Sequence, residues 1–421
     1  MAIRFCQFLL FAVGLAWIFY GAHENLNQTQ ISGFLIALSM SWWLTPEIRA
    51  RAMRLGLMDK PGEERRIHKI PVPRLGGVAI YISIFVTFTM LVAICGRFPK
   101  QGGLAGIAVG GTIIFVLGLL DDLESIPAKV KLAVQVLAAC AAYSLGVRIK
   151  SLPMPATLDL DFGFIHLHGG MPIDLGPFSL PLTVFWLVAI ANAVNLIDGM
   201  DGLAAGVSLI SALTMWAVAL AVNIDQPYAA LIAAVLAGAL LGFLRWNFNP
   251  AHIFLGDSGA YLAGFILGAV SITGVLKGAT AVTLIVPTFI IVWLILFFPL
   301  LDTSWAVVRR LSKGKSIFAP DAEHIHHRLL QAGLSQKMTA YLIYGMSGLL
   351  GLVAAHLVNQ ELYFLALGGS VIAMALFFAE VLNRHRQRRN KGQRSSEPDL
   401  LPGEYNKQPD EPLADTKASE S

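Results

Sequence analysis

The segment "LPLTVFWLVAIANAVNLIDGMDGLAAG", residues 180–206, joins an apolar stretch to a polar, glycine-rich turn. Four polar side chains follow one another at intervals of three: Asn192, Asn195, Asp198 and Asp201. This spacing keeps them near one side of a helix end. The simplest alternative is a solvated turn, in which Asn and Asp cap the helix and glycine adopts positive φ. Such a turn explains one or two of these residues, so we interpret the four together as part of a ligand site.

The composition is that of an integral membrane protein. Hydrophobic residues make up 56% of the 421 residues and charged residues 14%, with a mean hydropathy of +0.65. A soluble domain is nearer a quarter charged. The three cysteines all lie in apolar segments and form no CxxC pair. Neither a disulfide framework nor a cysteine-based metal site is therefore expected.

Twelve apolar windows predict an all-α, polytopic integral membrane protein with about 11–12 transmembrane helices. They are residues 5–21, 31–46, 75–95, 103–120, 128–146, 179–197, 203–223, 228–245, 258–275, 281–300, 338–357 and 362–383. The first window lacks a convincing cleavage site, so we expect an anchor rather than a signal peptide. We expect three parts: an extra helix and outer loop in 1–30, a membrane domain in 31–383, and a polar, disordered cytoplasmic tail in 384–421.

Lysine and arginine predict the orientation of these helices. Of the 31 Lys and Arg, 26 lie at the N-terminus, in the tail, and in alternate loops, which are 47–74, 121–131, 198–202, 245–257 and 301–337. Positive residues mark the cytoplasmic side, so we expect both termini and these loops to be cytoplasmic. The outer segment 147–178 alternates weakly and predicts a short hairpin.

Further polar segments fall in the same cytoplasmic loops, which predicts one active site on that face. They are "GLLDDLESIPAKVKLAVQ" with Asp121, Asp122 and Lys131, "RWNFNPAHIFLGDSGAYLAG" with Asn247, Phe254 and Asp257, "APDAEHIHHRLLQAGL" with His324, His326, His327 and Arg328, and the basic loop "DKPGEERRIHKIPVPRLGG" with His68, Lys69 and Arg74. Each residue has a simpler alternative: the acidic pair as a helix cap, the lysine as an interfacial side chain, and the phenylalanine as a core aromatic.

The residue types on this face suit phosphate chemistry. Several Asp and Asn oxygens favour Mg²⁺ or Mn²⁺ over zinc, while Lys, His and Arg suit phosphate oxygens. The histidines leave zinc as an alternative, although they lack HExxH spacing and a nearby cysteine. The chain has no P-loop and no dinucleotide-binding glycine motif. We therefore expect phosphoryl transfer between a soluble phosphate substrate and a lipid-borne one.

Five ordered motifs resemble those of the polyprenyl-phosphate N-acetylhexosamine-1-phosphate transferases, and more closely their bacterial WecA/TagO-like branch. They are the four segments quoted above and "NAVNLIDGMDGLAAG", and the resemblance covers about residues 31–380. It implies transfer of a sugar-1-phosphate from a UDP-N-acetylhexosamine to undecaprenyl phosphate, with release of UMP and a need for Mg²⁺ or Mn²⁺. It also implies a multi-pass enzyme of the bacterial cytoplasmic membrane, acting in the first membrane step of cell-envelope polysaccharide synthesis.

The resemblance implies a role for each matching residue. Asn195 and Asp257 match metal-binding positions, Asp121 and Asp122 match a catalytic acidic pair, and Lys131 matches a phosphate-facing lysine. The positions that match nucleotide-sugar binding are Asn192, Asp198, Asp201, Asn247, Phe254 as the aromatic that stacks on uracil, His324, His326, His327 and Arg328. "HIHH" replaces the three adjacent histidines of the sister muramoyl-pentapeptide branch, which argues for a simple sugar.

Two other functional classes are alternatives. An ion or solute transporter predicts carboxylates near helix centres and repeated halves, neither of which the sequence shows. An intramembrane metalloprotease predicts an HExxH motif, which is absent from the chain. The sequence leaves open which UDP-N-acetylhexosamine is used, the prenyl chain length, the polymer made and whether the protein forms a homodimer. No nucleic-acid partner is expected.

Overall fold

A computed structural model describes most of the chain, within one compact unit, Met1–Ala375. The described residues are 2–18, 26–58, 71–95, 103–152, 160–161, 166–167, 173–221, 227–275, 288–314 and 324–358. The predicted span 362–383, the predicted tail 384–421, and His68 and Lys69 of the basic loop lie outside the described residues.

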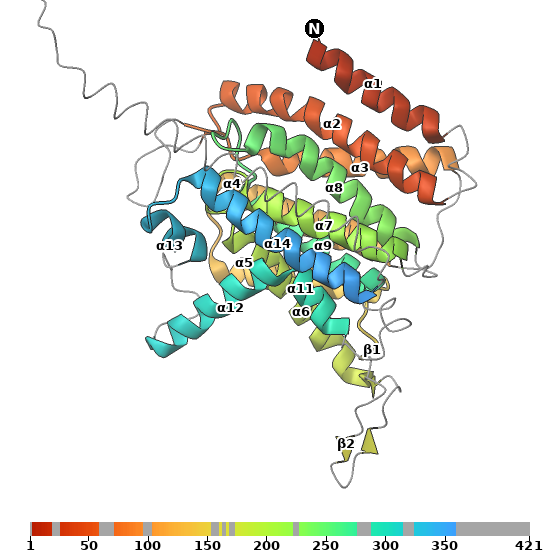
Figure 1. The fold of residues 1–421 in the computed structure, drawn as a ribbon, viewed down its shortest axis with the longest axis vertical. Helices are drawn as coiled ribbons and strands as arrows, with labels where there is room; N and C mark the ends of the chain where they lie inside the picture. The colour runs from red at the N-terminus through yellow and green to blue at the C-terminus, as the bar shows by residue number, and fades with distance from the viewer. Residues whose placement is uncertain are drawn as a thin grey trace, which may run out of the picture. The chain divides into compact units, whose positions relative to one another are not determined.

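The described residues are mostly helical and contain few strand residues, which confirms the predicted fold class (Figure 1). The helices are α1 (Ala2–Trp17), α2 (Leu26–Arg54), α3 (Gly76–Cys95), α4 (Leu104–Leu123), α5 (Ala128–Ser144), α6 (Ser179–Leu196), α7 (Leu203–Ala221), α8 (Pro227–Asn247), α9 (Gly256–Val270), α11 (Thr288–Ile295), α12 (Phe297–Ser312), α13 (Ile325–Gln331) and α14 (Gln336–Val358). In the described part of the chain, six are long and apolar enough to cross a membrane: α3, α4, α6, α7, α8 and α14. The total number of spans stays a prediction.

The hairpin predicted in 147–178 is confirmed. β1 (Ser151–Leu152) pairs antiparallel with β4 (Ile173–Asp174), and β2 (Leu160–Asp161) pairs antiparallel with β3 (His166–Leu167). These strands and α13 lie at opposite ends of the helices (Figure 1). This placement agrees with the opposite sides that the charge pattern assigns to the two segments.

Helix α9 lies at the centre of the helical bundle. All its residues from Ser258 to Val270 are buried, and it packs against α3, α4 and α6. Small residues allow the close approach: a Cβ on Gly264 would meet the backbone of Ile190 and Ala191 on α6. Close backbone packing through small residues is typical of membrane helices, because lipid provides no hydrophobic force between them.

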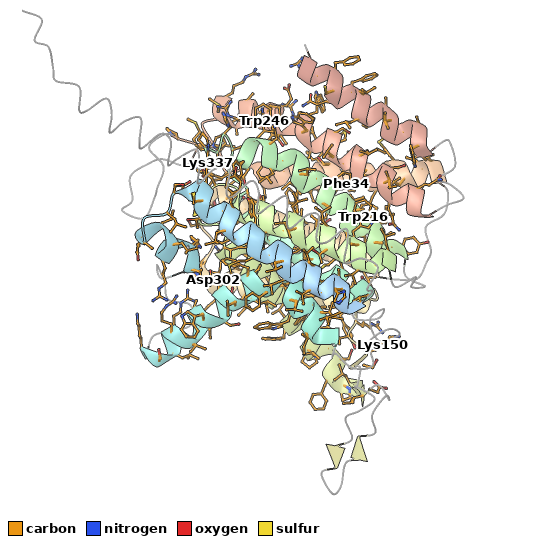
Figure 2. The ribbon with its side chains drawn as sticks, in the orientation of Figure 1. Phe34, Lys150, Trp216, Trp246, Asp302 and Lys337 are labelled. Carbon is orange, nitrogen blue, oxygen red and sulfur yellow. The ribbon has the colours of Figure 1, made fainter. Side chains whose placement is uncertain are left out.

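Helix α2 is attached to its neighbours through a backbone group that Pro46 leaves without a partner. Proline has no N–H, so the carbonyl of Trp42, four residues earlier, lacks its usual helical donor. Gln7 Nε2 of α1 donates to this carbonyl at 3.2 Å and Trp246 Nε1 of α8 donates at 3.3 Å. Further along α2, Phe34 stacks on Trp216 of α7, with ring centroids 5.6 Å apart (Figure 2).

Two predicted loops are partly helical, and one predicted span is broken. Helix α2 continues to Arg54 through the predicted loop 47–74, because Ile48 and Ala52 are buried on one face. Helix α12 likewise extends into the predicted loop 301–337. The window 281–300 contains two helices separated by Leu296. Hydropathy windows detect apolar length alone, so they miss amphipathic turns beyond the apolar stretch.

Candidate active site

The N-terminus of α9 is fixed by Asp122, the last acidic residue of α4. Its Oδ1 accepts from the Asp257 N–H at 2.7 Å, and its Oδ2 accepts from the Ser258 N–H at 3.0 Å and the Ser258 hydroxyl at 2.6 Å. Gly118 lets α4 approach, since a Cβ there would collide with the Ser258 backbone. Asp122 therefore satisfies backbone donors that begin a helix. The simpler alternative for the acidic pair was a helix cap. Asp122 does act as a cap, but of α9 and not of its own helix, and its catalytic role stays a prediction.

Four predicted site residues meet beside this helix end, each from a different helix. Asn195 Nδ2 of α6 donates to Asp257 Oδ1 at 3.0 Å. Lys131 Nζ of α5 lies 3.5 Å from Asp257 Oδ2 and forms a direct ion pair with Asp121 of α4. The other oxygen of Asp121 accepts from the Ile126 N–H at 2.8 Å. We call Asp121, Lys131, Asn195 and Asp257 the carboxylate cluster.

The cluster concentrates negative charge. Burial, a hydrogen bond shared with Asp121, and the charges of Asp122 and Asp121 raise the pKa of Asp257 to about 7. Burial, followed by the charges of Asp257 and Asp122, also raises the pKa of Asp198. A bound cation would relieve this repulsion.

The donor set of the cluster suits a hard cation. A carboxylate and an amide oxygen are ligands that Mg²⁺ accepts. Within the described ranges, no three His, Cys, Asp or Glu side chains are grouped closely enough to hold a metal ion. His324, His326 and His327 are among the residues that form no such group. The fit therefore rests on Asp257 and the amide oxygen of Asn195.

Asn192 supports the cluster from one turn earlier on α6. It forms a reciprocal amide pair with Gln135 of α5, in which Asn192 Nδ2 donates to Gln135 Oε1 at 2.7 Å. Gln135 follows Lys131 by one helical turn, and Asn192 precedes Asn195 by three residues. The pair therefore joins α5 to α6 and keeps Lys131 and Asn195 close to each other. The predicted contact of Asn192 with a nucleotide-sugar stays a prediction.

Asp201 and Asn247 hold the loop that leads into α9. Asp201 is 3% exposed, and its Oδ2 accepts from Asn249 Nδ2 at 2.8 Å and from the Ala251 N–H at 3.0 Å. Asn247 Nδ2 donates to the Ile253 carbonyl at 2.9 Å. Both residues were predicted to bind the nucleotide-sugar; in the structure they hold this loop, and their contact with the donor stays a prediction.

Two backbone contacts fix Phe254 and the turn at Gly202. The N–H of the half-buried Phe254 donates to the Pro73 carbonyl at 2.8 Å, so the strand-like segment before α3 crosses the loop here. Gly202 has a φ of +75°, a conformation that favours glycine, and its carbonyl accepts from the Tyr344 hydroxyl at 2.5 Å. Helix α14 thereby fixes the turn that follows Asp201.

The histidine segment, residues 324–328, lies against the same turn. His324 and His326 are buried, His327 is half-buried and Arg328 is exposed. The ring of His326 faces Gly199, where a Cβ would collide with Nε2. Among the described residues neither ring nitrogen of His326 has a hydrogen-bond partner. Burial, followed by the charge of His327, lowers the pKa of His326 to about 4, so its ring is neutral at physiological pH.

Asp302 was not predicted from the sequence as a residue of this site. Asp302 of α12 is 2% exposed and contacts both His324 and the N–H of Ile325. The sequence feature that could have identified Asp302 is an acidic residue soon after the apolar window 281–300, just as Asp198 follows the window 179–197. Arg74 of the predicted basic loop lines a cavity of about 210 Å³ together with Asp122.

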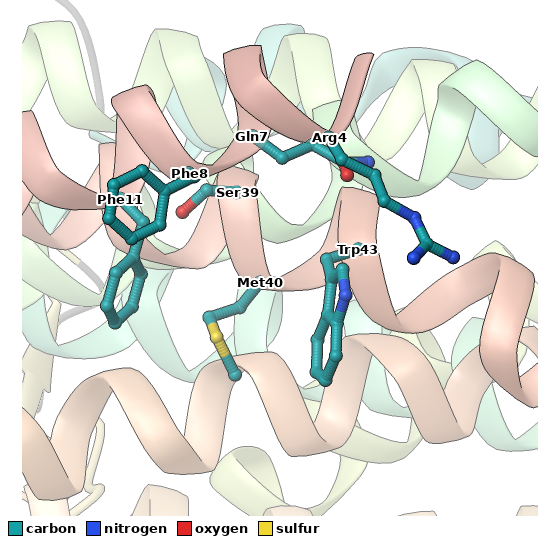
Figure 3. Close-up of a pocket in the computed structure, with 7 residues that line it drawn as sticks. All are labelled: Arg4, Gln7, Phe8, Phe11, Ser39, Met40 and Trp43. Carbon is teal, nitrogen blue, oxygen red and sulfur yellow. The ribbon is translucent and has the colours of Figure 1, made fainter. Parts of the chain in front are cut away.

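A second cavity, of about 230 Å³, lies between α1 and α2. Arg4, Phe8 and Trp43 are among the residues that line it (Figure 3). It contains none of the predicted site residues.

Comparison with known proteins shows the family to which the chain belongs. The profile of glycosyl transferase family 4 matches residues 104–275. A probable undecaprenyl-phosphate N-acetylglucosaminyl 1-phosphate transferase of Bacillus subtilis is 32% identical over 352 residues, covering 84% of this chain and 90% of that protein. A decaprenyl-phosphate N-acetylglucosaminephosphotransferase of Mycobacterium tuberculosis is 35% identical over 388 residues, covering 88% and 93%.

A third relative comes from Escherichia coli. Its undecaprenyl-phosphate alpha-N-acetylglucosaminyl 1-phosphate transferase is 31% identical over 362 residues, covering 82% of this chain and 92% of that protein. These relatives and the profile span the helices that carry the carboxylate cluster. The chain therefore belongs to the polyprenyl-phosphate N-acetylglucosaminyl 1-phosphate transferases, within glycosyl transferase family 4.

Proposed function

We propose that this protein transfers N-acetylglucosamine-1-phosphate from UDP-N-acetylglucosamine to undecaprenyl phosphate and releases UMP. The relatives' names supply the sugar phosphate and the polyprenyl acceptor. The observation that carries the proposal is the Lys131–Asp121 ion pair beside Asp257 and Asn195. It combines a cation for phosphate oxygens with oxygen ligands for a metal ion, and this is the equipment of phosphoryl transfer.

In the proposed reaction, an oxygen of the lipid phosphate attacks the β-phosphorus of the UDP-sugar. A new P–O bond forms, the bond from that phosphorus to the bridging oxygen breaks, and UMP leaves with the bridging oxygen. A phosphate monoester has its second pKa near about 6, so the acceptor is already mostly dianionic at neutral pH. Bringing two anions together is therefore the larger requirement.

Residues of the cluster meet that requirement by charge and position. Lys131 binds an oxygen of the acceptor phosphate and offsets the repulsion between the two substrates. Asp121, which pairs with Lys131, orients the acceptor and takes its residual proton. Asp257 and Asn195 would hold Mg²⁺ or Mn²⁺, which would neutralise charge on the pyrophosphate. Phe254 stacks on uracil, and the histidine segment binds the donor.

We place the enzyme in the bacterial cytoplasmic membrane with this site facing the cytoplasm. The support is the distribution of lysine and arginine, which places the loops of the cluster on the positive side. A UDP-sugar is soluble and a polyprenyl phosphate is membrane-bound, so a site at the helix ends is accessible to both. A transporter would require carboxylates along its path, whereas Asp121 and Asp257 lie within three residues of a helix end.

The test is transfer by the purified protein in detergent. Radiolabelled UDP-N-acetylglucosamine, undecaprenyl phosphate and Mg²⁺ are expected to give an organic-extractable product and one UMP per product. A panel of UDP-sugars identifies the donor, and Lys131→Ala serves as the inactive control. Absence of a lipid product with every UDP-sugar would refute the proposal.

A further inference from the structure

Asp302 on α12 joins the histidine segment to the membrane domain. Its Oδ2 lies 2.8 Å from His324 Nδ1, and its Oδ1 accepts from the Ile325 N–H at 2.8 Å. Figure 2 labels Asp302 on α12, next to α13. Both carboxylate oxygens are therefore occupied by α13 and the residue before it.

These two bonds determine how α13 begins. The bond at Nδ1 sets the ring orientation of His324 and leaves Nε2 as its remaining nitrogen. The bond to Ile325 satisfies one of the N–H groups that the first turn of a helix leaves unpaired. A buried carboxylate with both oxygens used in this way positions other groups and does not itself reach a substrate.

The position of His324 affects that of His326, which in turn contacts the turn at Gly199. The His324 and His326 rings are stacked, with centroids 5.8 Å apart and planes inclined by 10°. His326 in turn packs on Gly199, between Asp198 and Asp201. A shift of His324 would therefore move His326 away from the turn that is proposed to bind the donor.

We propose that Asp302 is a positioning residue for the nucleotide-sugar: it orients His324 and the start of α13, and through them the histidine segment. The inference rests on the proposed function. It is specific to the donor, because Lys131 and Asp121 at the acceptor side contact α4, α5, α9 and the loop between α4 and α5, and these ion pairs do not involve α12. Loss of Asp302 should weaken use of the donor and leave use of the acceptor unchanged.

The experiment measures KM for each substrate in the purified full-length enzyme. Asp302→Asn keeps an acceptor for the Ile325 N–H but places an amide against His324 Nδ1. KM for UDP-N-acetylglucosamine should rise about tenfold, the scale of one lost charge-assisted hydrogen bond, with KM for undecaprenyl phosphate within about twofold of wild type. His324→Gln should raise the same KM. If Asp302 acts through His324, the double variant should be no worse than the more severe single variant.

Ser304→Ala, an exposed position on the same helix, is the matched control. The inference is overturned if Asp302→Asn behaves like this control, if both KM values rise together, or if the two single effects multiply. If Asp302→Asn does not fold, as judged by loss of a cooperative thermal unfolding transition without nucleotide, His324→Gln decides alone. The inference then requires a raised KM for UDP-N-acetylglucosamine and an unchanged KM for undecaprenyl phosphate. A wild type that makes no lipid product refutes the proposed function, which is a separate outcome.

Discussion

Asp122 should stabilise the fold as the cap of α9. The change to asparagine at this position leaves one carbonyl oxygen, which can still accept from the Asp257 N–H. The amide nitrogen cannot accept from the Ser258 N–H, which in the wild type donates to the carboxylate at 3.0 Å. The Ser258 hydroxyl can reverse its role and accept from the amide.

The magnitude follows from counting donors. One buried N–H without a partner costs about 1–3 kcal/mol, so Asp122→Asn should lower the free energy of unfolding by about that amount. Asp122→Ala leaves two buried N–H groups unpaired and should cost about 2–6 kcal/mol. Ser258→Ala removes one hydroxyl bond and leaves both N–H groups paired, so it should cost only about 0.5–1.5 kcal/mol. Transfer activity should fall in the same order, because Asp257 moves with the helix end.

The assay is thermal unfolding of the three variants in detergent, with transfer rates measured on the same samples. The expected order of destabilisation is Asp122→Ala, then Asp122→Asn, then Ser258→Ala. If Asp122→Ala unfolds at the wild-type temperature while its activity is abolished, the carboxylate acts on a substrate and the capping argument is wrong.

Three further predictions address the chemistry and the charges. If Asp121 only takes a proton, Asp121→Asn should lower the transfer rate about 10²–10⁴-fold at neutral pH, and the rate should recover as the pH rises. A burst of UMP from UDP-sugar alone would instead indicate a covalent aspartyl-phosphate. Asn195→Ala and Asp257→Ala should each abolish turnover although the variants still fold and insert into the membrane. EDTA should inactivate the wild-type enzyme, and added Mg²⁺ should restore its activity. Full activity after exhaustive chelation contradicts the metal role. Because the pKa of His326 is lowered from 6.5 to about 4, the unfolded chain binds more protons between these values, so stability falls as pH falls through this window. His326→Asn should lose less stability over the same window in thermal unfolding, and an unchanged slope contradicts this.

Much of the fold could be predicted from the sequence, because the features that specify it are local. A bilayer requires an apolar stretch of defined length, and most windows match helices to within a few residues. The charge pattern grouped the polar segments on one side, and the motifs indicated the family that the comparisons confirm. The windows missed the amphipathic ends of α2 and α12, because those turns are buried on one face only.

The contacts within the site could not be predicted, because they join residues far apart in the chain. Asp122 accepts from the N–H of Asp257, 135 residues later, Gln135 pairs with an amide 57 residues away, and Asp302 holds a histidine 22 residues away. Periodicity and hydropathy describe one segment at a time and contain no information about which segments meet. The sequence by itself determined which residue types lie in the loops that are predicted to be cytoplasmic. Only tertiary packing decided which carboxylates contact Lys131 and Asn195 and which carboxylate satisfies a helix end.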